Sequence, residues 1–205
     1  VTLPVAAGAT IKNSASSTTL TLSGDIIQGV IAAPAITVMG AGNVTFSGAI
    51  NTGTGILNLG SDVIYSVSND PNGATIAGNL ALGYDFIGAG MGRTSSGILR
   101  TFSIGDSVAA GATGNANPDL TVSAVVSGAG LSLAKAGTGV MLLSGTNTYS
   151  GPTAISAGQL NVSNAAALGN NSTLRLVSVG ATSTLGVSGG LSFNANTVLS
   201  LNGTG

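Results

Sequence analysis

The chain contains no cysteine, no histidine and no tryptophan, and its six acidic residues are all aspartate. Without cysteine there is no disulfide framework, and without cysteine or histidine the usual ligands of zinc and transition metals are absent. We therefore expect no metal and no cofactor. General bases are equally scarce, because besides aspartate only Lys12 and Lys135 remain to activate a nucleophile. The sequence predicts a protein that is not an enzyme.

Charged residues make up only 5% of the 205 residues, and the formal net charge is -1. No basic run is present, so nucleic-acid binding is not expected. A nearly neutral surface gives little electrostatic repulsion between copies, which favours self-association. The most apolar stretch, residues 30–42, is interrupted by Pro34 and is too short to span a bilayer, so we expect no membrane insertion by this region.

Aromatic residues are also rare, at 3%, whereas the chain has 33 glycines and 43% apolar residues. Such a composition favours short strands joined by tight turns. Apolar residues recur in pairs two positions apart along the whole chain, which is the period of a β-strand with one buried face. The pairs are Leu20 and Leu22, Ile36 and Val38, Val44 and Phe46, Leu57 and Leu59, Leu80 and Leu82, Leu120 and Val122, Leu131 and Leu133, Met141 and Leu143, Leu160 and Val162, Leu174 and Leu176, Leu185 and Val187, Leu191 and Phe193, and Leu199 and Leu201.

These strands are too short, and the aromatic residues too few, for a typical β-sandwich. A solenoid needs only small side chains that stack on their equals in the next coil. We therefore predict an all-β fold, a right-handed parallel β-helix (β-solenoid), which forms a single domain over residues 1–205 with irregular coils. Residues 62–119 hold five of the six aspartates and the least regular strand pattern, so we expect longer loops there.

One segment, residues 133–160, carries a dense pattern of glycines around two short apolar runs. Its characteristic residues are Lys135, Gly137, Gly139, Leu143, Ser144, Gly145, Asn147, Thr148, Tyr149, Gly151, Ala157 and Gly158. In order and spacing these residues resemble the passenger-associated transport repeat of bacterial autotransporters. The resemblance implies a parallel β-helical passenger that is exported to the cell exterior, where such proteins serve as adhesins, autoaggregation factors or stalks.

From this resemblance and the composition we expect a secreted structural or adhesive β-helix of a bacterial surface protein, self-associating and filament-forming. Its expected location is extracellular or at the cell surface, after export with a signal peptide that has been removed. Its expected partners are further copies, joined end to end or laterally, or adjoining segments of a longer chain. Two alternatives remain open: a glycan-binding adhesin module that uses loops in residues 62–119, and a polysaccharide lyase.

The candidate ligand contacts lie in the middle of the chain. Arg93 and Arg100 flank a glycine-rich segment and are candidates for contact with an acidic glycan. Asp62, Asp70 and Asp85 are dispersed beside turn-forming residues, which favours turn capping over calcium binding or catalysis.

The candidate contacts for self-association lie inside the repeat. Met141 and Leu143 are predicted to face inward, so Val140 and Leu142 face outward, an unusual position for two bulky apolar residues.

A second set of self-association candidates lies in the first and last coils. Val1, Leu3, Leu199 and Leu201 belong to coils without charged caps, and an open apolar core there favours end-to-end stacking.

Two further residue types have structural expectations. Tyr149 is predicted to pack against the fold with its hydroxyl reaching solvent. A set of asparagines is predicted to form stacked amide ladders at the corners of the coils: Asn147, Asn161, Asn164, Asn170 and Asn171.

Overall fold

The computed structural model describes residues 10–12, 20–22, 26–27, 35–39, 44–46, 49–59, 62–65, 73–83, 85–87, 92–94, 97–107, 118–170, 175–193 and 195–202. Every regular element among them is a strand. In chain order the strands are β1 (Thr10–Lys12), β2 (Leu20–Leu22), β3 (Ile26–Ile27), β4 (Ala35–Met39), β5 (Val44–Phe46), β6 (Ala49–Asn58), β7 (Val63–Tyr65), β8 (Ala74–Ala81), β9 (Asp85–Ile87), β10 (Gly92–Thr94), β11 (Leu99–Ile104), β12 (Leu120–Val122), β13 (Val125–Ser127), β14 (Ser132–Ala136), β15 (Val140–Leu143), β16 (Thr153–Ile155), β17 (Gly158–Val162), β18 (Arg175–Gly180), β19 (Ser183–Val187) and β20 (Thr197–Asn202).

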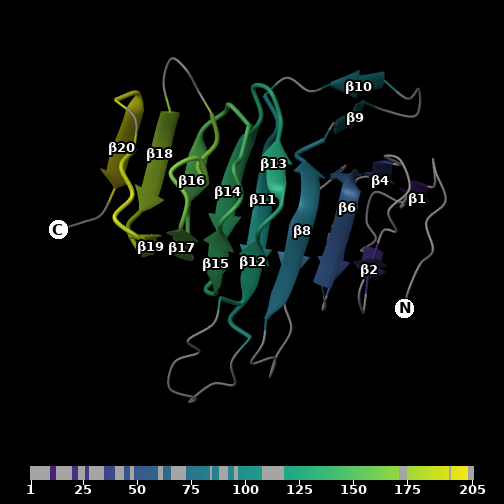
Figure 1. Ribbon diagram of the computed structural model, residues 1–205, viewed down its shortest axis with the longest axis horizontal. Coiled ribbons are helices and arrows are strands. Elements are labelled where there is room, and N and C mark those ends of the chain that lie inside the picture. Colours follow the sequence, from purple (N-terminus) through teal and green to yellow (C-terminus); the bar gives the residue numbers. More distant parts are fainter. Residues whose placement is uncertain are drawn as a thin grey trace.

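Two long sheets contain most of these strands. Sheet A has the order β1-β4-β6-β8-β12-β15-β17-β19, with β3 paired to β6 and β13 paired to β8, and sheet B has the order β2-β5-β7-β11-β14-β16-β18-β20. Neighbouring strands within both sheets run parallel. Among the described strands, β9 and β10 form the only antiparallel pair. Figure 1 shows the strands side by side along the long axis, with β1 near one end and β20 at the other.

The chain alternates between the two sheets, and each return places a strand beside its predecessor. It passes from β14 in sheet B to β15 in sheet A, then through β16 and β17, and then through β18 and β19. We call one such passage through sheet B and then sheet A a coil. The all-β prediction is thus confirmed, and the parallel stacked sheets are consistent with a β-solenoid. The right-handed sense stays a prediction, and so does the single domain.

Inward side chains stack in register from coil to coil, as a solenoid core requires. In sheet A, Val122 lies opposite Leu143, and Leu143 lies opposite Val162. All three side chains are 0% exposed. Each buried side chain of this size stabilises the fold by roughly 1.5 to 3 kcal/mol through loss of apolar surface from water. The predicted inward facing of Met141 and Leu143 is confirmed, since both are 0% exposed.

One predicted pair lies outside the described residues in part. The sequence pattern pairs Leu174 with Leu176, but Leu174 and the side chain of Leu176 are not described, and the buried residues of β18 are Val177 and Val179, at 0% and 6% exposure. Apolar residues occupy both alternating phases of this segment, so the pattern alone does not decide which phase faces the core.

The corners between sheet B and sheet A differ in length along the chain. Residues 137–139 connect β14 to β15, residues 156–157 connect β16 to β17, and residues 181–182 connect β18 to β19. The corresponding connection between β11 and β12 runs from residue 105 to residue 119. The longest of these four corners therefore falls within residues 62–119, where the sequence predicts longer loops.

Candidate functional site

The segment that resembles the transport repeat forms β14, β15, β16 and β17, so it contributes four successive strands to the two sheets. Glycine is required at its first corner. Gly137 has a φ of +74°, and a Cβ there would collide with the carbonyl oxygen of Ile104 in the preceding coil. Only glycine meets both conditions, because L-residues with side chains rarely adopt this φ. The corner glycine allows the backbones of adjacent coils to approach closely.

Lys135 lies in the inward phase of β14, where sequence reasoning expects apolar residues. It sits between Phe102 and Ile155 in the sheet B register and is 0% exposed. Its ammonium nitrogen donates hydrogen bonds to the carbonyl oxygens of Ala136 at 2.8 Å and Gly137 at 2.8 Å. Burial lowers the pKa of Lys135 from 10.5 to about 8, and the charge of Asp119 opposes this effect.

The Lys135 ammonium also joins two coils. It donates a third hydrogen bond, at 3.3 Å, to the carbonyl oxygen of Ala157 at the next corner. A buried ammonium is tolerated only when its donors are satisfied, and here backbone carbonyls satisfy them. The lysine of the motif therefore acts as an internal clamp between corners.

Asp119 fastens the base of the long corner. Its Oδ1 accepts hydrogen bonds from the Ser107 N–H at 2.8 Å and the Ser107 hydroxyl at 2.6 Å, and its Oδ2 accepts one from the Val140 N–H at 2.6 Å. Asp119 is 3% exposed and Ser107 is 0% exposed. The carboxylate thereby links Ser107 to Asp119 and ties both to β15. The Ser107 hydroxyl is engaged by Asp119 inside the fold, away from any substrate in solvent.

Asn147 bridges three successive coils. Its Oδ1 accepts a hydrogen bond from the Val126 N–H at 2.8 Å, and its Nδ2 donates one to the Ala167 carbonyl at 2.6 Å. The prediction of stacked amide ladders is therefore wrong for Asn147, because its partners are backbone groups. It is also wrong for Asn161, because its side chain accepts a hydrogen bond from Gln159 of the same strand and lies opposite Gly186, not another amide, in the next coil.

Asn164 likewise departs from an amide ladder. Its Oδ1 accepts from the Ala166 N–H at 2.8 Å, and its Nδ2 donates to the Thr146 hydroxyl at 3.1 Å. Asn170 is exposed, and Asn171 lies outside the described residues.

Tyr149 packs inside the repeat, as predicted, but its hydroxyl does not reach solvent. The residue is 0% exposed, and its hydroxyl is 2.7 Å from the hydroxyl oxygen of Thr153, which is itself 0% exposed. The expected solvent contact is wrong, because the Thr153 hydroxyl provides an internal partner.

Arg100 corrects a second prediction. It is 4% exposed and lies in the same phase of β11 as the buried residues Phe102 and Ile104. Its guanidinium donates to the carbonyl oxygens of Leu82 at 2.7 Å and Leu59 at 3.2 Å. The expected contact of Arg100 with a glycan is wrong, since these carbonyls hold the side chain inside. Alternation was the missed signal, because Arg100 shares the phase of two apolar neighbours.

Arg93, the other candidate glycan contact, lies on β10 in register with Phe86. Its side chain is outside the described part of the structure, and its glycan contact stays a prediction. Asp62 accepts a hydrogen bond from the Thr101 N–H at 2.8 Å, which is a link between neighbouring strands. Asp85 lies at Thr94 in the register of β9 and β10, and Asp70 is outside the described residues.

The self-association candidates divide into three groups. Val140 and Leu142 alternate with the buried residues of β15 and are themselves half-buried, on the outer face of sheet A. Leu199 and Leu201 are 50% and 69% exposed on the terminal strand of sheet B. Val1 and Leu3 lie outside the described residues.

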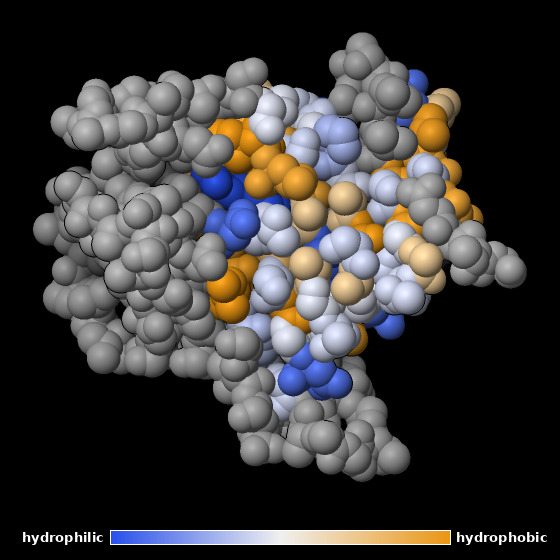
Figure 2. All heavy atoms as spheres, turned by 180° about the vertical axis from the view of Figure 1, so that it is seen from behind, coloured by the Kyte–Doolittle hydropathy of each residue, from blue (hydrophilic) through white to orange (hydrophobic). Residues whose placement is uncertain are grey.

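The face shown in Figure 2 mixes apolar and polar residues with few strongly hydrophilic ones, as the low charge content leads one to expect. None of the described residues forms a group of three or more acidic side chains suited to a metal ion. No helix long and apolar enough to cross a membrane occurs in the described part of the chain.

A comparison with protein families decides what the β14 to β17 segment is. The family model of the passenger-associated-transport-repeat matches residues 133–162. This segment is a passenger-associated transport repeat. The repeat indicates an autotransporter passenger domain and thereby a surface or secreted protein. No curated protein and no solved structure matches the chain. Within the repeat, Lys135 and Asn147 both make hydrogen bonds between coils, so its conspicuous polar residues hold the stack together.

Proposed function

We propose that this chain is a non-catalytic structural segment of an exported passenger, a right-handed β-helix that associates end to end through the edge formed by β19 and β20. The supporting observation concerns inward positions that have no cover. Leu201 continues a register that runs through Lys135, Ile155 and Val179. Those three are at most 6% exposed, whereas Leu201 is 69% exposed. The side chain is apolar, faces the core side and lacks a following coil among the described residues.

Two neighbouring positions have the same character. Leu199 follows Val177 in the sheet B register and is 50% exposed, and Val187 follows Val162 in the sheet A register and is 48% exposed. Together with Leu201 we call them the end face. Its strands β19 and β20 are sheet edges among the described strands, and parallel edges present backbone N–H and C=O groups that pair readily with a further strand. A coil from another copy would bury the apolar side chains and satisfy those groups at once.

The partner we propose for the end face is a further β-helical coil, supplied by a second copy stacked head to tail or by an adjoining segment of a longer chain. The chain is almost uncharged, so little electrostatic repulsion opposes contact between identical surfaces. Head-to-tail contacts do not close on themselves unless the rotation permits, and they therefore extend into filaments.

A pair of substitutions in one strand tests the proposal. Leu199 and Val198 are almost equally exposed, at 50% and 47%, but they face opposite sides of β20. Leu199→Asp places a charge on the end face and is expected to shift sedimentation velocity from oligomers to monomer. Val198→Asp is the matched control and should leave the oligomers intact. Equal sedimentation of the two variants and the unmodified chain would contradict the proposal.

A longer polypeptide that includes adjoining coils distinguishes the two kinds of partner. If the 205-residue chain associates and the longer polypeptide is monomeric, the end face is covered by neighbouring coils of the same protein. If both associate in a way that Leu199→Asp abolishes, the partner is a second copy.

A further inference from the structure

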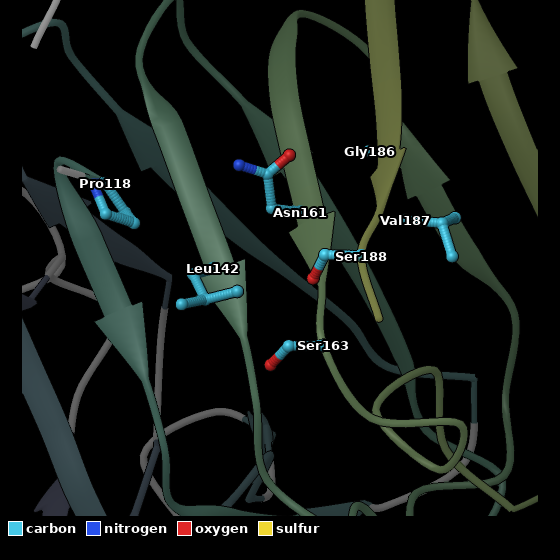
Figure 3. A pocket seen from close by; sticks show the side chains of 7 residues that line it. All are labelled: Pro118, Leu142, Asn161, Ser163, Gly186, Val187 and Ser188. Carbon is cyan, nitrogen blue, oxygen red and sulfur yellow. The ribbon is translucent and has the colours of Figure 1, made fainter. Parts of the chain in front are cut away.

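A groove crosses the outer face of sheet A where three successive coils stack. It has a volume of about 390 Å³. It is lined by Pro118, Leu142, Asn161, Ser163, Gly186, Val187 and Ser188. Figure 3 shows the side chains of Leu142, Asn161, Ser163 and Ser188 gathered beside one another across the strands. Leu142, Asn161 and Gly186 lie on the side of the sheet opposite the core, so neither the apolar stack nor the Lys135 and Asn147 hydrogen bonds involve these three residues.

One glycine of the groove makes room for the side-chain amide of Asn161. Leu142, Asn161 and Gly186 follow one another in the outward register of β15, β17 and β19. A Cβ at Gly186 would collide with Oδ1 of Asn161. The position has no positive φ, so the backbone does not demand glycine there. Glycine inside a strand otherwise weakens the strand, and it commonly marks a place where a ligand or another backbone approaches closely.

The polar groups of the groove are oriented and neutral. The amide of Asn161 is fixed because its Oδ1 accepts a hydrogen bond from Nε2 of Gln159 at 2.6 Å, which leaves the Asn161 NH₂ group as a donor facing the groove. The Ser188 hydroxyl donates to the Val162 carbonyl at 3.3 Å, so its lone pairs are available to accept. Ser163 adds a second hydroxyl.

The remaining lining is apolar and uncharged. Pro118 and Leu142 offer C–H surface, and no lining residue carries a charge. An anionic ligand such as a phosphate or a uronic acid would find no cation there, and a metal ion would find no carboxylate. Hydroxyl and amide groups beside small apolar surfaces match the alternating hydroxyl and C–H surface of a neutral sugar.

The dimensions fit a short oligosaccharide. Adjacent strands are about 4.8 Å apart, so the three coils extend the groove over about 10 Å along the stacking axis. A volume of about 390 Å³ lies near the lower end of the range of roughly 300 to 1,000 Å³ for small-molecule sites. This space suits two or three sugar rings laid across the strands.

We propose that this groove binds a neutral oligosaccharide, with the Asn161 amide, which lies over Gly186, donating to a sugar hydroxyl. The proposal adds a ligand to the proposed role of the chain as an exposed surface segment. It uses the outer face of sheet A rather than the end face, apart from Val187 at their shared margin. Binding and self-association can therefore be measured separately.

The test is isothermal titration of the full 205-residue chain with cellotriose, maltotriose and chitotriose as neutral probes, and with a triuronate as the anionic probe. Saturable binding of at least one neutral probe is expected. Asn161→Asp keeps the acceptor oxygen for Gln159 and removes the donor, and it should weaken binding by about ten-fold, the effect of one lost hydrogen bond. Gly186→Ala should weaken binding at least as much.

The matched control is Thr184→Ala, an exposed residue of the same strand outside the groove lining, which should bind as the unmodified chain does. Circular dichroism checks that each variant retains its β-structure. Three results would overturn the proposal: no neutral probe binds, only the triuronate binds, or both groove variants bind like the control. Sedimentation of the same samples reports self-association independently, so failure of the sugar site and failure of end-to-end stacking are distinguishable.

Discussion

Because the ammonium group of Lys135 is buried, the stability of this protein should change with pH in the alkaline range. Its folded-state pKa is about 8, because burial disfavours the charged form, against 10.5 for the ordinary side chain. Between these two values the unfolded chain binds more protons than the folded chain. The free energy of unfolding must then rise with pH across this window. Below about pH 8 the destabilisation caused by burying the charged ammonium is fully present, and above about pH 10.5 it has vanished.

The size of the effect follows from the same two pKa values. At about 1.4 kcal/mol per pH unit, the interval corresponds to a gain of about 3 kcal/mol in unfolding free energy. The comparison protein is Lys135→Met, which fills similar space without a charge. This substitution deprives the Gly137 and Ala157 carbonyls of a donor and is expected to lower stability by roughly 1 to 3 kcal/mol at pH 7. The test is therefore how the difference in unfolding free energy between the two proteins changes with pH, and not the size of that difference at one pH.

The assay is urea unfolding followed by circular dichroism at intervals from pH 7 to pH 11, for the unmodified chain and for Lys135→Met. All other side chains are common to both proteins, so their contribution cancels in the difference. That difference should grow by about 3 kcal/mol in favour of the unmodified chain between pH 8 and 10.5. Parallel profiles for the two proteins, or a difference that shrinks with pH, would refute the reasoning.

Three further predictions concern packing, hydrogen bonds and metal. Leu143→Asp should abolish the β-signal in circular dichroism, because an unpaired buried carboxylate costs several kcal/mol, whereas Leu142→Asp should remain folded; equal loss in both would contradict the observed facing. Asn147→Leu should lower the unfolding free energy by about 2 to 4 kcal/mol in urea titration, since Val126 N–H and the Ala167 carbonyl lose their partner, and an unchanged midpoint would disprove the bridging role. Millimolar calcium or a chelator should leave the melting temperature unchanged, and a shift of several degrees would show a metal site.

The sequence was most informative where one apolar phase was unambiguous. Leu120 and Val122 flank the polar Thr121, and both are 0% exposed. The transport repeat was also recognisable from glycine spacing, because residues such as Gly137 must satisfy steric conditions that no other side chain meets. Where apolar residues filled both phases, as around Leu176 and Val177, alternation could not decide the facing.

The sequence by itself determined the period of two, and hence short strands with one buried face, because that period follows from backbone geometry within a single strand. Only the tertiary structure decided the fate of the polar residues in the inward phase. From the sequence alone, Arg100 and Lys135 look like surface charges. They can be buried because carbonyl oxygens from other segments accept their hydrogen bonds. The Leu59 carbonyl that accepts from Arg100 is 41 residues away along the chain. A local pattern cannot specify a partner at that separation, since stacking of the coils brings the two groups together.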